Sequence, residues 1–239
     1  MVHGFRGFKD WAFLPWLAES LAGQGHMVAR FSFSGCGVGP TGDEIDDLEA
    51  FEANTISREV DELHKVLTAC DAGDVFPRPP RRMALVGHGR GGGVALVAAA
   101  ESDRVSRLAT LSSMQRFDRW KPETVAEWRS NGKTYVMDMR SGRQLPIGIG
   151  LLDDFEANRE RLDMLRAAAA VRAPWLVLHG ADDLTVPPDD ARALASAGRN
   201  SRLKFIEGAG HAYGTRHPMG EPSPALNQVT EALAEHLED

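Results

Sequence analysis

The sequence predicts a single α/β domain with a mainly parallel, doubly wound sheet. Short, fully apolar runs such as 83–86 and 175–178 alternate with amphipathic helical patterns. This alternation is typical of parallel strands that are buried on both faces and covered by helices. The length of 239 residues suits one large domain of this kind better than two small ones.

The individual elements follow from hydrophobic periodicity and from Gly and Pro positions. Asn54 or Thr55 can cap a helix that runs to about Cys70, with apolar residues on one face. Strands are expected at 27–33, 83–86, 108–111, 175–178 and 203–206, and further helices at 91–100, 188–197 and 224–237.

Between Ser113 and Ala173 the alternation lapses, and we predict an inserted helical lid at about 114–172 within a single domain of residues 1–239. Aromatic and methionine side chains in this stretch suggest an apolar acyl or aromatic ligand, although lid aromatics can also simply pack together. They are Phe117, Trp120, Trp128, Tyr135, Met137 and Met139.

Composition excludes several classes of function. The net charge is −7 and no basic stripe interrupts this acidic background, which argues against binding to nucleic acid. No apolar run is long enough to span a membrane and the N-terminus lacks a signal-peptide pattern, so we expect a cytoplasmic protein without membrane partners. The two cysteines, Cys36 and Cys70, lack metal-ligand spacing and are expected to be reduced thiols. We expect neither a metal nor a cofactor, and the sequence leaves the oligomeric state open.

The run Gly87-His88-Gly89-Arg90-Gly91-Gly92 allows two interpretations. It matches the GxGxxG turn of dinucleotide-binding folds, but no acidic residue ends the next strand at 111–113, so only an NADP-type site using Arg116 stays open. It also matches a nucleophile elbow, G-x-S-x-G, with Gly89 at the serine position.

Two downstream loops favour the elbow. His179-Gly180-Ala181-Asp182-Asp183 follows the strand at 175–178 and resembles the HGxxD segment that carries the acid of a catalytic triad, a match that favours Asp183 over Asp182. Glu207-Gly208-Ala209-Gly210-His211 follows the last strand and can deliver a histidine base. The order of nucleophile, acid and base along the chain is that of the elbow-type hydrolases.

Together, HGFRGFKDWAFLPWLAE, RFSFSGCGVGP, GHGRGGGVAL, PWLVLHGADDLTVP and EGAGHAYG resemble the α/β-hydrolase superfamily, in particular bacterial hydrolases related to dienelactone hydrolases, serine aminopeptidases and small carboxylesterases. The resemblance implies acyl transfer on a small ester or acyl substrate, without a cofactor. It assigns Asp183 to orient His211, and the backbone N–H groups of Phe5 and Arg90 to the oxyanion hole. His3 is then structural.

Two departures accompany the resemblance. Gly89 has no side chain and cannot form an acyl-enzyme. The resemblance also implies a full strand before His3, where only two residues stand, so we expect either that the natural reading frame begins upstream of Met1 or that the N-terminal strands are truncated. We expect this loss to weaken the sheet, and a version extended upstream to be more stable.

Four functional hypotheses follow. The first is an ester hydrolase of the serine type, impaired or altered at Gly89, and the second is a ligand-binding homologue without catalysis. In the third, His211 and Asp183 activate water without a covalent intermediate. An NADP-binding oxidoreductase is the least favoured.

Overall fold

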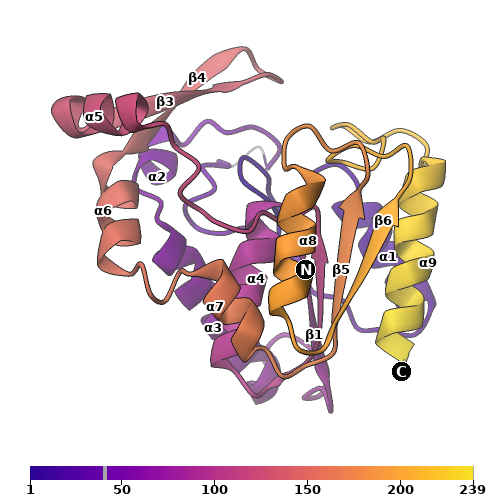
Figure 1. Cartoon of the computed structure of the whole chain (residues 1–239). Coiled ribbons are helices and arrows are strands. Elements are labelled where there is room, and N and C mark those ends of the chain that lie inside the picture. The colour runs from indigo at the N-terminus through magenta and orange to yellow at the C-terminus, as the bar shows by residue number, and fades with distance from the viewer. Residues whose placement is uncertain (40–41, 239) are drawn as a thin grey trace.

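The computed structural model describes residues 1–39 and 42–238, coloured by residue number in Figure 1; Pro40, which ends the RFSFSGCGVGP motif, lies outside these residues. The helices are α1 (Leu14–Gly23), α2 (Leu48–Glu52), α3 (Ile56–Ala72), α4 (Arg90–Glu101), α5 (Pro122–Asn131), α6 (Ile149–Ala157), α7 (Met164–Ala170), α8 (Pro188–Ala197) and α9 (Pro224–Glu238). The strands are β1 (Met83–His88), β2 (Val105–Leu111), β3 (Lys133–Asp138), β4 (Arg143–Gly148), β5 (Trp175–Gly180) and β6 (Ser201–Ile206).

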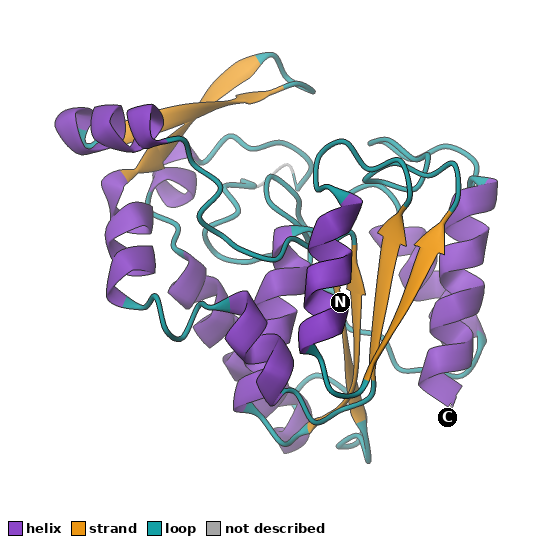
Figure 2. Cartoon of the chain, viewed as in Figure 1, coloured by secondary structure: helices purple, strands orange, loops and turns teal. Residues whose placement is uncertain are grey.

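The central sheet is parallel and has helices on both faces (Figure 2). Its strand order is β1-β2-β5-β6, and each neighbouring pair is parallel. Side chains of successive strand residues point to opposite faces. Leu85 therefore packs in a core with α3, α4, α7 and α8, whereas Val86 packs in a second core with α1 and α9. The predicted α/β class and doubly wound sheet are confirmed.

One predicted strand is wrong. Residues 27–33 form no ladder with β1, because the position between them is occupied only by Met1 and Val2. The amino group of Met1 donates to the carbonyl of Ala29, the N–H of Val2 donates to the carbonyl of Val86, and Val2 forms an isolated parallel bridge with Gly87. Among the described residues no strand pairs with this segment.

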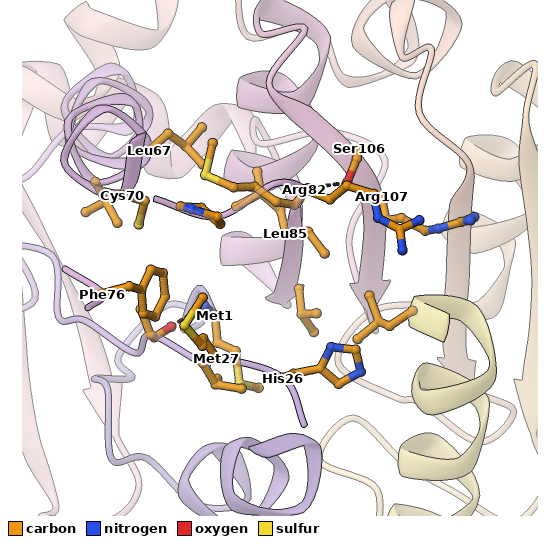
Figure 3. A pocket seen from close by; sticks show the side chains of 18 of the residues that line it. Met1, His26, Met27, Leu67, Cys70, Phe76, Arg82, Leu85, Ser106 and Arg107 are labelled. Atoms are coloured by element: carbon orange, nitrogen blue, oxygen red, sulfur yellow. Dashed lines mark hydrogen bonds between the residues drawn. The ribbon is translucent and has the colours of Figure 1, made fainter. Parts of the chain in front are cut away.

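A groove of about 340 Å³ lies between this segment and β1. Figure 3 shows Met1 and Met27 on one side of it and Leu85 on the other, with Cys70, Leu67 and Phe76 at one end. His26 and Arg107 lie at its opposite end. Most of the residues that line the groove have apolar side chains, although polar atoms also border it.

The predicted lid segment, 114–172, is not purely helical. It contains α5, α6 and α7, but also the antiparallel hairpin of β3 and β4, which extends away from the central sheet (Figure 1). Trp128 is fully buried in a small core with Leu145 and Phe51, and Phe117 is buried in the main core. These aromatics therefore pack within the fold, whereas Tyr135, Met137 and Met139 are exposed.

Within the part of the chain that the structure describes, no helix is both long and apolar enough to cross a membrane.

Candidate active site

The turn between β1 and α4 is tight, and Gly89 stands at its apex. Gly89 has φ +54° and ψ −121°, a conformation that is strained for residues with a Cβ. A Cβ on Gly87 would lie 2.4 Å from the carbonyl oxygen of Gly91, and one on Gly91 would lie 2.1 Å from the carbonyl oxygen of His3. Positions 87 and 91 must therefore be glycine for strand, helix and N-terminal segment to cross so closely.

The ring of His211 faces Gly89. A Cβ placed on Gly89 would lie 3.3 Å from Nε2 of His211 and 3.9 Å from Cα of Gly4. The loop after β6, which carries His211, thus meets the elbow and the N-terminal loop at the C-terminal end of the sheet (Figure 1). Ligand sites in open parallel sheets occur at this end.

Asp183 lies directly behind His211. Its Oδ2 accepts a hydrogen bond of 2.8 Å from Nδ1 of His211, which leaves Nε2 directed toward Gly89. Its Oδ1 accepts from the N–H groups of Thr185 and Val186, so the loop after β5 fixes the carboxylate. The neighbouring Asp182 is exposed and does not take this position.

The Asp183 carboxylate is fully buried, yet it is stabilised in its charged form. Burial alone would raise its pKa, but the hydrogen bonds from His211 and from the backbone of Val186 and Thr185 hold the pKa of Asp183 below its usual value. A buried carboxylate that stays ionised can both orient the imidazole and stabilise an imidazolium. The pair of Asp183 and His211 therefore has the geometry of an acid and base couple.

His88 supports the position of His211 from within the fold. It is buried, stacks on Trp11, and its Nε2 donates to the backbone carbonyl of His211 at 3.0 Å. Burial, and to a lesser degree the nearby His211, lowers the pKa of His88 to about 3, so its ring is neutral at neutral pH. His88 is therefore a positioning residue.

The N-terminal loop brings Phe5 close to Arg90. The guanidinium of Arg90 lies 4.4 Å from the centroid of the Phe5 ring, and Gly4 lies beside Gly89. Among the described residues, the backbone N–H groups of Phe5 and Arg90 have no hydrogen-bond acceptor. Their roles as oxyanion donors stay predictions; Phe5 follows Gly4, which lies beside Gly89, and Arg90 follows Gly89 directly.

Glu59 is a site residue that sequence reasoning missed. It lies on α3, is 3% exposed, and forms an ion pair with the Arg90 side chain. It also accepts a hydrogen bond of 2.7 Å from Nδ2 of Asn54. Through Arg90 it holds the start of α4 against Phe5, and so connects the two proposed oxyanion donors. An acidic residue in an amphipathic helix gives no sequence signal for this contact.

His3 lies under the loop, where its Nδ1 donates to the carbonyl of Gly4 and its Nε2 accepts from the N–H of Phe33. Burial lowers the pKa of His3, which favours a neutral ring. Its two hydrogen bonds connect the N-terminal loop to Phe33, in keeping with a structural role.

Other candidates lie apart from His211. Ser34 is hydrogen-bonded to Glu62 and Arg58, and within residues 1–39 and 42–238 neither Ser34 nor Ser113 forms a hydrogen bond to His211. Cys36 is free and buried, and burial raises the pKa of its thiol, which makes it a poor nucleophile. Position 89 therefore gains no substitute nucleophile from these side chains.

The fold and the arrangement around the elbow define an α/β-hydrolase. The chain belongs to the alpha/beta hydrolase family, whose sequence model matches residues 1–223. No curated protein matches the chain.

Solved structures with esterase or lipase names share the fold at low sequence identity. A monoacylglycerol lipase of Paleococcus ferrophilus is 17% identical with a TM-score of 0.71, covering 98% of this chain and 91% of that one. Est1E of Butyrivibrio proteoclasticus, solved with ferulic acid bound, is 20% identical with a TM-score of 0.69, covering 99% and 86%. The esterase domain of a Rhodothermus marinus protein is 22% identical with a TM-score of 0.60, covering 98% and 82%.

Proposed function

We propose that this chain has the site of a serine-type ester hydrolase for small substrates with an apolar acyl group, and that Gly89 impairs or alters its activity. One observation carries the proposal: Nε2 of His211 lies 3.3 Å from where a Cβ at position 89 would stand. Asp183 orients the ring from the other side. The esterase and lipase names of the structural neighbours support an ester as the substrate class.

The chemistry explains what Gly89 removes. In a serine hydrolase the hydroxyl attacks the carbonyl carbon, the histidine takes its proton, and two N–H groups stabilise the oxyanion. Without the hydroxyl, no acyl-enzyme forms. Loss of a triad nucleophile costs on the order of 10⁶ in kcat, while binding and the oxyanion hole retain roughly 10³–10⁴ over water.

The decisive experiment is Gly89→Ser, assayed with p-nitrophenyl esters of several acyl lengths. We expect a gain of roughly 10³-fold or more in kcat/KM, about 4 kcal/mol of barrier. Gly89→Ala is the matched control, because it adds the same Cβ at the same strained φ without a hydroxyl, and should give no gain. His211→Ala in the Gly89→Ser background should abolish the gain.

A folded Gly89→Ser variant without esterase activity at any acyl length would refute the proposal. Turnover by the native chain that a fluorophosphonate does not inhibit would instead favour water activation by His211.

A further inference from the structure

The groove between residues 27–33 and β1 has an unusual charge composition. Of the described residues that line it, Arg82 and Arg107 are cationic, His26 can titrate, and none is acidic. The whole chain, by contrast, has 34 acidic residues against 27 lysines and arginines. A groove that has arginines but no acidic side chain, in a protein of negative net charge, favours an anion as its ligand.

The two arginines of the groove have no partner within the fold. Arg107 lies on β2, opposite Ala84 in the register with β1, and Arg82 directly precedes β1. Among the described residues, neither guanidinium forms an ion pair or a hydrogen bond. A guanidinium presents a planar set of N–H donors that matches a carboxylate. Both arginines are therefore available to a bound carboxylate.

His26 adds a buried nitrogen without a partner. Its Nε2 atom is inaccessible to solvent and has no hydrogen-bond partner among the described residues. Such an atom is costly to bury unless a ligand or water bonds to it. A neutral imidazole can carry its proton on Nε2 and donate it, so a contact to an anion requires no imidazolium. The ring lies at the same end of the groove as Arg107 (Figure 3).

The rest of the lining is suited to an alkyl chain. From the end at His26 the groove passes Met27 and Leu85 and reaches Leu67 and Phe76 at the other end (Figure 3). Its volume of about 340 Å³ is in the lower range of pockets that hold small ligands. Apolar side chains gain most from a ligand group that has no polar atoms of its own.

We propose that this groove binds a medium-chain fatty acid as its anion, with the carboxylate at Arg107, Arg82 and Nε2 of His26 and the alkyl chain directed toward Phe76. The groove borders residues 82–86, whereas Gly89 follows the opposite end of β1. The site is therefore separate from the elbow, and the inference does not depend on the proposed function. Binding is non-covalent.

An extended peptide is the alternative occupant, because no strand pairs with the edge of β1 that borders the groove, apart from the bridge at Val2. A peptide could form backbone hydrogen bonds with this edge. Backbone pairing alone, however, would leave Arg107 and Nε2 of His26 without partners. The fatty acid satisfies these groups and also covers the apolar lining.

Calorimetric titration of the native chain with hexanoate, octanoate and decanoate tests the inference. We expect a Kd on the order of 100 μM for decanoate. Affinity should rise roughly tenfold for each two methylene groups added, because each becomes buried in the groove. Decanol has the same chain without the charge, and should bind at least about tenfold more weakly.

Variants at the two ends localise the ligand. Arg107→Gln should weaken decanoate binding about tenfold, because it keeps a polar side chain but removes the charge. Arg202→Gln is the matched control, since Arg202 is exposed on β6 at the opposite edge of the sheet and should leave the Kd unchanged. His26→Ala should weaken binding severalfold by removing a donor.

Met27 tests the alkyl part of the site at a position where folding is not at risk, because its side chain lines the groove and is 44% exposed. Met27→Glu places a negative charge among the apolar side chains and should weaken decanoate binding tenfold or more. Met27→Leu, the matched control, keeps the apolar surface and should change the Kd less than about threefold.

Equal binding of decanoate and decanol, or an affinity that does not rise with chain length, would overturn the inference. Unchanged decanoate binding to folded Arg107→Gln or Met27→Glu would do the same. Binding of a capped peptide of alternating valine and threonine that decanoate does not displace would assign the groove to a peptide instead.

Discussion

Acid should destabilise this protein through His88, because the pKa of this histidine differs between the folded and the unfolded chain and that difference corresponds to a free energy of unfolding. The unfolded chain presents a histidine with the ordinary pKa of 6.5, whereas the folded chain lowers the pKa of His88 to about 3. The folded state therefore binds fewer protons between these values, and the stability present above pH 6.5 is lost as the pH falls toward 3. The linkage relation gives a loss of about 2 kcal/mol between pH 7.5 and pH 5.

The structure explains why protonation of His88 destabilises the folded state. Nε2 of His88 already donates to the carbonyl of His211, and a second proton would go to Nδ1, which is buried and has no partner among the described residues. His3 and His179 also have pKa values lowered by burial, so they add to the loss with the same sign. Asp183, with its lowered pKa, contributes stability that is lost only at more acidic pH.

Urea unfolding of the native chain and of His88→Gln at the two pH values measures the effect. Gln cannot titrate but keeps a side-chain donor, so the variant is expected to lose about 2 kcal/mol less than the native chain on acidification. An identical pH dependence of both proteins would show that folding does not lower the pKa of His88, and would refute the reasoning.

Two further predictions concern the elbow. Gly91→Ala should lower the free energy of unfolding by about 3 kcal/mol or more, because its Cβ would clash with backbone atoms of His3. Gly23→Ala, at the end of α1, is the control: its Cβ would have no atom within 4 Å, so it should be neutral or stabilising in the same unfolding assay. In the Gly89→Ser background, Glu59→Gln should lower kcat roughly tenfold with little change in KM, because it breaks the ion pair with the Arg90 side chain and loosens both proposed oxyanion donors. A change in KM alone would contradict a positioning role for Glu59.

The sheet and its helices were predictable because each element has a local signal. The helix from Ile56 to Ala72 begins after Thr55, whose side chain caps it, and ends at Gly73 in the left-handed conformation. The apolar runs at 83–86 and 175–178, which form most of β1 and β5, have no polar face, as strands covered on both sides require.

Residues 27–33 failed the prediction because a strand depends on its neighbour. Their composition favours a strand, and the structure gives them neither helix nor turn, but strand pairing requires a second strand alongside. Similarly, the sequences of β3 (KTYVMD) and β4 (RQLPIG) do not alternate strictly between apolar and polar residues, so hydrophobic periodicity does not predict this hairpin.

At the candidate site, the loops were predictable and the contacts between them were not. His211 and Asp183 stand in short motifs after strands, and the parallel sheet brings the ends of those strands together. Glu59 reaches Arg90 only through the packing of α3 on α4, which no local pattern records.

Asp183 and His211 differ in what they contribute to the fold, and this difference decides which substitution tests function. Asp183 is fully buried and accepts two backbone hydrogen bonds within its own loop, so replacing it would leave those N–H groups unpaired and disturb the loop as well as the histidine. The side chain of His211 is 24% exposed, and its ring bonds only to Asp183 among the described residues. We therefore expect His211→Ala to fold, so that a loss of the esterase activity gained by Gly89→Ser can be assigned to the site itself.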